Sequence, residues 1–191
     1  MLNRAMFLDR DGTINEEVNY LSHPKQLRLI GGAAEAIRLF NHAGLKVVIV
    51  TNQAGVGRGY FSEQAVHEIH AALEKSLLAQ EARVDAIYFC PHHPTAGVGA
   101  YKMNCHCRKP KPGLLEKAAS ELKIDLRQSL VVGDKISDLA AGHAVGCKNV
   151  LVRTGYGREA EKEFSNYSWQ PEFIGDDLLE AARWILQQLD I

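Results

Sequence analysis

Short apolar runs alternate with amphipathic stretches along nearly the whole chain, and this alternation constrains the fold more than any other feature. Residues 46–50 are continuous and β-branched, which is typical of a strand covered on both faces. From Ser62, a good N-cap residue, apolar side chains recur at helical spacing to about Gln80 and predict a long helix with one buried stripe. The other expected strands are residues 5–8, 86–89, 129–132 and 149–152, and the other expected helices are residues 33–42, 112–122, about 137–145 and 176 to about 189.

This alternation predicts a doubly wound α/β fold, in which helices cover both faces of a parallel sheet. At 191 residues the chain fits one domain, 1–191, that can bury a substantial core. The Gly-rich stretch 91–112 lacks helix signals, and we interpret it as an insertion that needs its own stabiliser. Ligands of such sheets bind beyond the carboxyl ends of the strands. The polar residues that directly follow expected strands, and that should converge on this edge, are Asp9, Asp11, Thr51, Asn52 and Asp134.

The charge balance argues against a polyanionic partner. The formal net charge is −1, so no overall field attracts nucleic acid or an anionic membrane, and the basic residues of 102–111 lack interleaved aromatics. No apolar run approaches the ~18 residues of a membrane span, and the N-terminus leads directly into the first expected strand without a signal peptide. We therefore expect a cytosolic protein and, because no heptad seam is present, a monomer. Disulfides are disfavoured in the cytosol, so the four cysteines call for another explanation.

Two carboxylates lie close together at the end of the first expected strand, in the motif Asp9-Arg10-Asp11-Gly12-Thr13. Gly12 allows the chain to turn sharply at once, since glycine accepts positive φ without a steric cost. Two acids held side by side can bind a hard cation, or can divide nucleophile and acid/base roles between them. A solvated acidic turn is the alternative interpretation of this motif when it stands alone.

Three further signals follow the carboxylate pair in order. They are Thr51-Asn52-Gln53, then Lys109 before Pro110, then Gly133-Asp134 with Asp138 four residues after Asp134. Each is weak by itself, because a strand-end turn or a solvated lysine would look the same. Together they closely resemble the haloacid dehalogenase (HAD) superfamily of phosphatases, and the resemblance covers essentially the whole chain.

The resemblance implies a Mg²⁺ centre built by three aspartates. Asp9 would be the nucleophile, forming an aspartyl-phosphate, and would also bind the metal. Asp11 would protonate the leaving oxygen, then activate the hydrolytic water, and would contribute its backbone carbonyl to Mg²⁺. Asp134 would complete the protein's share of the metal ligands, which for Mg²⁺ are oxygens.

The same resemblance assigns a phosphoryl-binding role to the remaining motif residues. Thr51 would offer its hydroxyl and Asn52 a backbone amide to the phosphoryl oxygens. Lys109 would place a cation where charge spreads in the transition state. Asp138 would orient Lys109 or a metal-bound water.

Cysteine and histidine residues bracket the insertion in the pattern Cys-x-His-x12-Cys-x-Cys. The four candidate ligands are Cys90, His92, Cys105 and Cys107. Three thiols and an imidazole fit a closed tetrahedral Zn²⁺ site, which has no open position for substrate and is therefore structural. Two alternatives stay open: His93 or His106 in place of His92, or ordinary buried thiols.

The combined motifs resemble one family within the superfamily, the D-glycero-D-manno-heptose-1,7-bisphosphate 7-phosphatases. The resemblance implies removal of the 7-phosphate in the synthesis of nucleotide-activated heptose for bacterial surface polysaccharide, with catalytic Mg²⁺, structural zinc and no large cap domain. By family resemblance, the residues expected around the sugar phosphate are Glu17, Val18, Asn19, Tyr20, Asn52, Gln53, Ala54, Arg108 and Lys135. Histidinol-phosphate phosphatases share the template and are the alternative within enzymes, beside a phosphotransferase. A catalytically silent, zinc-stabilised binding module is the alternative from another class.

Overall fold

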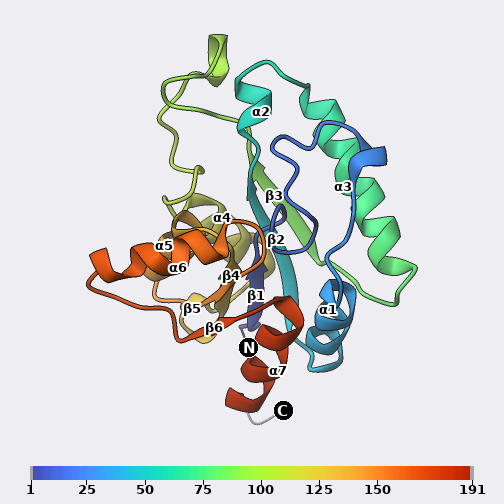
Figure 1. Ribbon diagram of the computed structural model, residues 1–191, viewed down its shortest axis with the longest axis vertical. Coiled ribbons are helices and arrows are strands. Elements are labelled where there is room, and N and C mark those ends of the chain that lie inside the picture. Colours follow the sequence, from blue (N-terminus) through green and yellow to red (C-terminus); the bar gives the residue numbers. More distant parts are fainter. Residues whose placement is uncertain (1, 190–191) are drawn as a thin grey trace.

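A parallel β-sheet organises residues 2–189, the part of the chain that the computed structural model describes (Figure 1). Within that range six strands lie in the order β3-β2-β1-β4-β5-β6, and every neighbouring pair is parallel. The strands are β1 (Ala5–Leu8), β2 (Lys46–Asn52), β3 (Ala86–Cys90), β4 (Leu130–Gly133), β5 (Lys148–Val152) and β6 (Phe173–Gly175). The strand order reverses at β1, between β2 and β4. The crevice beyond this switch point is where a doubly wound sheet binds its ligands.

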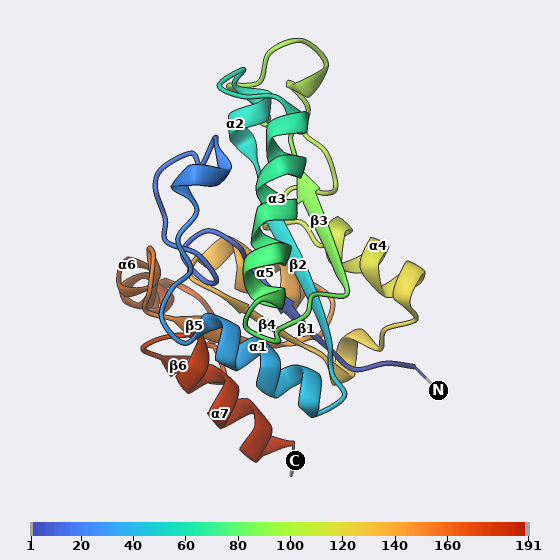
Figure 2. The same cartoon turned by 90° about the vertical axis from the view of Figure 1, so that its right-hand side faces the viewer.

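Helices cover both faces of the sheet because the strands are apolar on both faces. Met6 and Leu8 of β1 point into one core cluster, and Ala5 and Phe7 point into the other, as the pleat requires. On the first face lie α1 (Ala33–His42), α3 (Glu63–Leu78) and α7 (Leu178–Gln188), which Figure 2 shows in front of the sheet. On the second face lie α4 (Gly113–Leu122), α5 (Ile136–Ala144) and α6 (Gly157–Glu163). The doubly wound α/β fold predicted from the sequence is confirmed.

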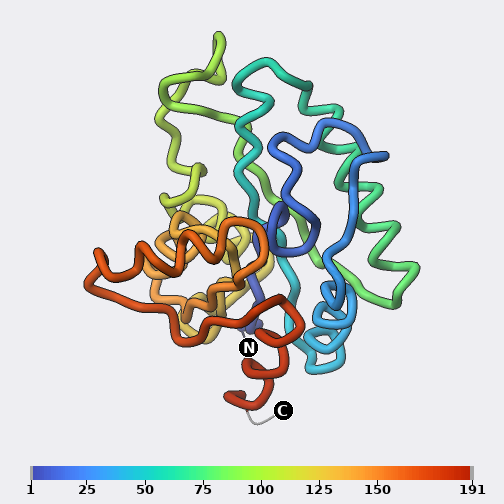
Figure 3. The backbone as a smooth tube through the Cα atoms, viewed as in Figure 1, coloured from blue at the N-terminus to red at the C-terminus, as the bar shows by residue number. Residues whose placement is uncertain are grey.

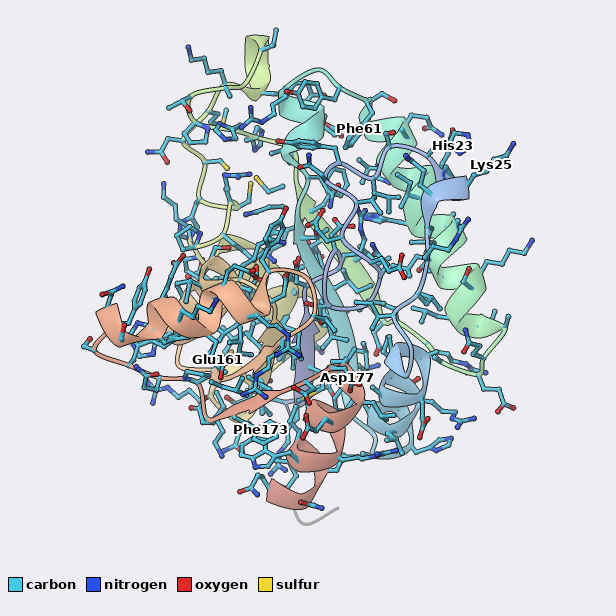
Figure 4. The ribbon with its side chains drawn as sticks, in the orientation of Figure 1. His23, Lys25, Phe61, Glu161, Phe173 and Asp177 are labelled. Carbon is cyan, nitrogen blue, oxygen red and sulfur yellow. The ribbon has the colours of Figure 1, made fainter. Side chains whose placement is uncertain are left out.

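The elements with strong apolar patterns were predicted within one or two residues of their observed bounds. Ser62 caps α3 as expected, since its hydroxyl accepts from the Ala65 N–H. The elements without such patterns were missed: β6 is three residues long, α2 (Ala54–Gly57) is a single turn, and α6 is largely polar. β6 is held by its neighbours instead, and its Phe173, which is labelled in Figure 4, lies near α7. The Phe173 ring stacks on Trp184 of α7 with ring centroids 4.9 Å apart.

The second strand is longer than the sequence suggested. Thr51 and Asn52 were expected just after it, but they are its last two residues, because the ladder with β3 continues to Thr51↔Phe89 and Asn52↔Cys90. Their position at the carboxyl edge is unchanged. The strand therefore delivers both side chains to the crevice on rigid backbone.

The insertion 91–112 leaves β3, extends beyond α2 and returns to the carboxyl edge of the sheet before α4 (Figure 3). Its one regular piece among the described residues is the 3₁₀ turn Gly99–Tyr101. The Val98 N–H donates to the Gly57 carbonyl at 2.8 Å, which ties the insertion to α2. No large cap domain interrupts the fold between residues 2 and 189, and no helix in that range is long and apolar enough to cross a membrane.

Candidate active site

A polar cavity of about 320 Å³ opens at the carboxyl ends of β1, β2 and β4. The loop after β1, the turn after β2, the returning end of the insertion and the segment after β4 line it, together with Tyr156. Its lining includes Asp9, Asp11, Glu17, Asn19, Tyr20, Thr51, Asn52, Gln53, Ala54, Arg108, Lys109, Lys135 and Asp138. Most residues expected from the sequence therefore face one space. Val18 is 40% exposed and Asp134 is fully buried, and neither of them lines the cavity.

A buried lysine joins two carboxylates at the base of the cavity. Lys109 Nζ lies 2.8 Å from Asp9 Oδ1 and 2.7 Å from Asp138 Oδ1, and it also donates to the Val50 carbonyl at 2.7 Å. Burial by itself would raise the pKa of Asp9, but Lys109 and Lys135 outweigh it and hold that pKa below its ordinary value. Asp9 is thus an ionised, oriented carboxylate, as a nucleophile must be. Lys109 lies 100 positions away in the sequence and arrives through the insertion.

A second lysine lies among the oxygens expected to bind metal. Lys135 Nζ is 3.4 Å from Asp134 Oδ2, 3.5 Å from the Asp11 carbonyl and 4.0 Å from Asp9 Oδ2. Burial raises the pKa of Asp134 to about 8, helped by the neighbouring charges of Asp9 and Asp138. A carboxylate cluster of this kind needs a cation. The oxygens of Asp134, of the Asp11 carbonyl and of Asp9 already surround the Lys135 ammonium group. Oxygens of this kind are the ligands that Mg²⁺ prefers.

Asp138 belongs to the same acidic group, with Asp9 and Asp134, but its oxygens are engaged. Oδ1 is paired with Lys109, and Oδ2 accepts the Lys135 backbone N–H at 3.0 Å. Burial first, then the charge of Asp9, raises the pKa of Asp138. Asp138 is therefore placed to orient Lys109, one of the two roles that the resemblance implied, while Asp9 and Asp134 keep oxygens facing a common point.

Asp134 is held in place by Gly12 and by the loop 154–156, which the sequence motifs did not predict. Gly12 has φ +88° and Gly155 has φ +56°, and a Cβ on either residue would collide with Asp134 Oδ2. The Tyr156 N–H donates to that oxygen at 2.9 Å, and the Thr154 hydroxyl donates to the Gly12 carbonyl at 2.6 Å. The close approach explains why glycine is needed at both positions. The sequence offered only a weak signal, a Thr-Gly-Tyr stretch one residue after an apolar strand, and nothing in it marks the Tyr156 N–H.

The Asp11 carboxylate is held by three neighbours. Arg10 donates from Nη2 at 2.7 Å and Gln53 from Nε2 at 2.9 Å to Oδ2, while Asn15 donates at 3.0 Å to Oδ1. The Gln53 amide also donates to the Thr51 hydroxyl at 2.9 Å. Gln53 therefore links the acid/base candidate to the phosphoryl-binding candidate within a buried network.

Asn52 fastens the insertion to the sheet edge. Its side-chain Nδ2 donates to the Lys109 backbone carbonyl at 3.0 Å, and its side-chain Oδ1 accepts the Lys109 backbone N–H at 3.1 Å. This two-point contact fixes the backbone from which the Lys109 side chain enters the cavity. Arg108 donates from Nη1 to the His92 carbonyl at 3.1 Å, so the insertion braces the arginine as well.

The four candidate zinc ligands meet as the spacing predicted. The Sγ atoms of Cys90, Cys105 and Cys107 lie 3.2–3.4 Å apart, and His92 Nδ1 lies 3.5 Å from Cys107 Sγ (Figure 4 shows sulfur atoms gathered beside the insertion). These separations approximate the edges of a tetrahedron of ligands around one ion, and they are too long for disulfides.

The two alternative histidines are engaged elsewhere. His93 accepts at Nδ1 from the Ala96 N–H, 3.0 Å away, and its Nε2 faces Arg58. His106 is exposed and contacts Glu116 at 2.6 Å. His92 is therefore the imidazole that completes the cluster.

The fold and the aspartate–lysine site define a phosphatase of the HAD hydrolase class, and a family model described as HAD-hydrolase-like matches residues 106–181. The chain is 48% identical to the D-glycero-beta-D-manno-heptose-1,7-bisphosphate 7-phosphatase of Haemophilus influenzae, covering 81% of this chain and 84% of that protein. It is 44% identical to the enzyme of the same name from Yersinia pestis, covering 97% and 90%. The chain belongs to the D-glycero-D-manno-heptose-1,7-bisphosphate 7-phosphatase family.

A solved structure agrees with this assignment. The D,D-heptose 1,7-bisphosphate phosphatase from B. bronchiseptica, crystallised with magnesium and phosphate, superposes with a TM-score of 0.85 at 33% identity. The similarity covers 97% of this chain and 99% of that one. The whole described fold is thus that of a known heptose-bisphosphate phosphatase.

Proposed function

We propose that this protein hydrolyses the 7-phosphate of D-glycero-D-manno-heptose 1,7-bisphosphate through an aspartyl-phosphate on Asp9, with Mg²⁺ at the catalytic centre. The observation that carries the proposal is the buried Asp9 carboxylate, paired with Lys109 at the base of a cavity that Arg108 also lines. The names of its relatives support the substrate. The reaction would serve the synthesis of nucleotide-activated heptose for bacterial surface polysaccharide.

Three oxygens would hold Mg²⁺: a carboxylate oxygen of Asp9, the backbone carbonyl of Asp11 and a carboxylate oxygen of Asp134. The cation that already lies among them, Lys135 Nζ, supports this assignment. The metal would neutralise the phosphate so that a carboxylate can approach it. Lys135 also contacts Glu17 at 3.3 Å, so it has a second partner on the cavity wall.

In the first half-reaction Asp9 attacks phosphorus while the bond to the sugar oxygen breaks. Lys109 donates to the phosphoryl oxygens, together with the Thr51 hydroxyl and the Asn52 backbone amide, and stabilises the charge that spreads over them. Asp11 gives its proton to the departing sugar oxygen. In the second half-reaction Asp11, now a carboxylate, takes a proton from the water that attacks the aspartyl-phosphate.

The phosphate that is not cleaved needs its own cation. Arg108 lines the cavity and is braced by the His92 carbonyl, and its planar guanidinium suits a phosphate bidentately. We assign sugar contacts to Glu17, Asn19 and Tyr20, which also line the cavity. A bisphosphate would then span the cavity from Lys109 to Arg108.

Zinc at Cys90, His92, Cys105 and Cys107 would be structural. The donor set of three thiolates and one imidazole is complete, so no position is left for a substrate. Arg108 and Lys109 directly follow the last ligand. The metal would therefore stabilise the segment that supplies both cations.

The test is phosphate release from heptose 1,7-bisphosphate, as each anomer, and from histidinol phosphate, with and without Mg²⁺. We expect turnover of the bisphosphate that requires Mg²⁺ and disappears in Asp9→Asn. When the reaction is quenched with acid during turnover of phosphate-labelled substrate, the wild-type protein should retain label and Asp9→Asn should retain none. Preference for histidinol phosphate would replace the proposed substrate while keeping the chemistry. Turnover that survives in Asp9→Asn would refute the nucleophile.

A further inference from the structure

Arg10, between the two catalytic aspartates, is completely buried although it carries a charge. Its guanidinium points away from the solvent and forks around the Asp11 carboxylate. Nε donates to Oδ1 at 3.1 Å, and Nη2 donates to Oδ1 at 2.9 Å and to Oδ2 at 2.7 Å. A planar fork of this kind fixes the orientation of a carboxylate as well as its position. None of the roles assigned above uses this arginine.

The other side of the guanidinium is held by residues from two distant elements. Nη2 also donates to Gln53 Oε1 at 3.1 Å, and Nη1 lies 3.1 Å from Nε2 of His70, a buried residue of α3. Because an arginine can only donate, His70 Nε2 must be the acceptor, and its imidazole is therefore neutral. Burial, and after it the charge of Arg10, lowers the pKa of His70 to about 3, which agrees with that protonation state.

We propose that Arg10 is the positioning residue for the acid/base Asp11, and that His70 holds Arg10 in place from behind. When Asp11 passes its proton to the departing ester oxygen, the electron pair of the O–P bond moves to that oxygen and Asp11 becomes a carboxylate. The guanidinium then lies on both of its oxygens and stabilises the new charge. This inference rests on the proposed function for the roles of Asp9 and Asp11, and it holds for any alkyl phosphate substrate.

Comparing substrates with different leaving groups distinguishes this positioning role of Arg10 from a merely structural one. A sugar or other alkyl oxygen must be protonated as it departs, whereas p-nitrophenolate leaves without a proton. The value of kcat/KM reports the steps up to formation of the aspartyl-phosphate, so it detects the first proton transfer alone. A positioning defect at Asp11 should therefore lower kcat/KM for the alkyl ester and spare the aryl ester.

The chain allows a matched pair of variants at His70. In His70→Gln the side-chain oxygen can accept from Arg10, and in His70→Met a chain of similar length has no such acceptor. Arg10→Met removes the fork itself. The aryl substrate is p-nitrophenyl phosphate. The alkyl substrate is heptose 1,7-bisphosphate or histidinol phosphate, whichever the wild type hydrolyses faster. Melting temperatures are recorded for every variant.

We expect Arg10→Met to lower kcat/KM for the alkyl ester about 10²-fold, within the range of general acid catalysis, and for p-nitrophenyl phosphate less than about threefold. His70→Met should lower the alkyl value about tenfold, because one buried guanidinium N–H loses its partner. His70→Gln should stay within about twofold of the wild type on both substrates. If Arg10→Met does not fold, the His70 pair carries the test.

Equal losses on the two esters in Arg10→Met, or equal values for His70→Met and His70→Gln, would overturn the inference. Two further variants make a failure of the proposed function distinguishable. Asp9→Asn must silence both esters, and Asp11→Asn must lower the alkyl ester selectively. If either fails, the assignment of the nucleophile or of the acid is wrong, and the role of Arg10 falls with it.

Discussion

The carboxylate–lysine centre at the sheet edge and the cysteine–histidine cluster of the insertion are built in opposite ways. In the first, Asp9 and Lys109 are 4% and 3% exposed and come from segments 100 positions apart. In the second, four ligands come from residues 90–107, and the surrounding loop has little regular structure. The sheet therefore holds the first centre together, whereas the second lies in a loop that the proposed zinc would stabilise.

The two centres meet at Arg108 and Lys109. Cys107 ends the cluster, and the next two residues enter the catalytic cavity, where Asn52 binds the Lys109 backbone from the sheet side. Rigid strands thus fix Asp9, the proposed nucleophile, and the loop that carries the cysteine–histidine cluster supplies Arg108 and Lys109. If the cluster binds zinc as proposed, one part of the site is fixed by the sheet and the other depends on metal.

The largest effect should follow from removing the buried lysine. Lys109→Met should reduce turnover about 10³-fold, because the phosphoryl charge loses its fixed cation. It should also lower the free energy of unfolding by about 3–5 kcal/mol, since Asp9 and Asp138 stay buried and both lose the cation closest to them. Urea unfolding and steady-state kinetics measure the two effects.

The double variant Lys109→Met/Asp138→Leu is the control for this prediction. Removing the second carboxylate should restore much of the stability and none of the activity. A double variant that regained turnover would show that Lys109 acts by neutralising Asp138 rather than by binding the phosphoryl group.

Loss of zinc should have the next largest effect. Cys107→Ala should abolish the bound zinc and lower turnover about 10²-fold, because a shift of about 1 Å in Arg108 and Lys109 is enough for that loss. Metal content by mass spectrometry and kinetics with saturating Mg²⁺ measure both. Cys147→Ala, a buried thiol outside the cluster, is the matched control and should keep the metal. Full zinc content in Cys107→Ala would contradict the ligand set.

Arg108→Ala should have a smaller and selective effect. We expect kcat/KM for heptose 1,7-bisphosphate to fall about thirtyfold, the size of a lost charge-assisted contact, and that for the heptose 7-phosphate to fall about twofold. Lys111→Ala removes a nearby charge that does not line the cavity and should be neutral. Equal losses on the two substrates would remove Arg108 from recognition of the second phosphate.

The smallest effect concerns His70 and the free energy of unfolding at acid pH. His70 has a pKa lowered to about 3, so it stays neutral in the folded protein while it gains a proton in the unfolded chain below about pH 6.5. Its contribution to stability is thus present above pH 6.5 and lost as the pH falls toward 3, by up to about 1.4 kcal/mol per pH unit. His70→Gln should flatten that part of the pH dependence in urea unfolding. An unchanged slope would mean that His70 is protonated in the folded state.

Local patterns predicted the centres unequally. The Cys-x-His…Cys-x-Cys spacing predicted the four side chains that meet in the cluster, because a loop of this length can bring them together whatever surrounds it. The motifs placed Asp9, Thr51 and Asp134 at one edge of the sheet, since parallel strands end at one edge. The loop at Tyr156 was missed, because its contribution to Asp134 is a backbone N–H that any residue carries.

The sequence by itself determined the alternation of strands and helices, the buried stripes and the spacing of the cysteine–histidine cluster, since each depends on residues within one turn, one strand or one loop. Only the tertiary structure decided which side chains meet across the molecule: Lys109 with Asp9, Arg10 with His70, and Arg108 with the His92 carbonyl. Those contacts depend on strand order, register and the path of the insertion. Such properties arise when distant segments pack, and no local pattern of residues records them.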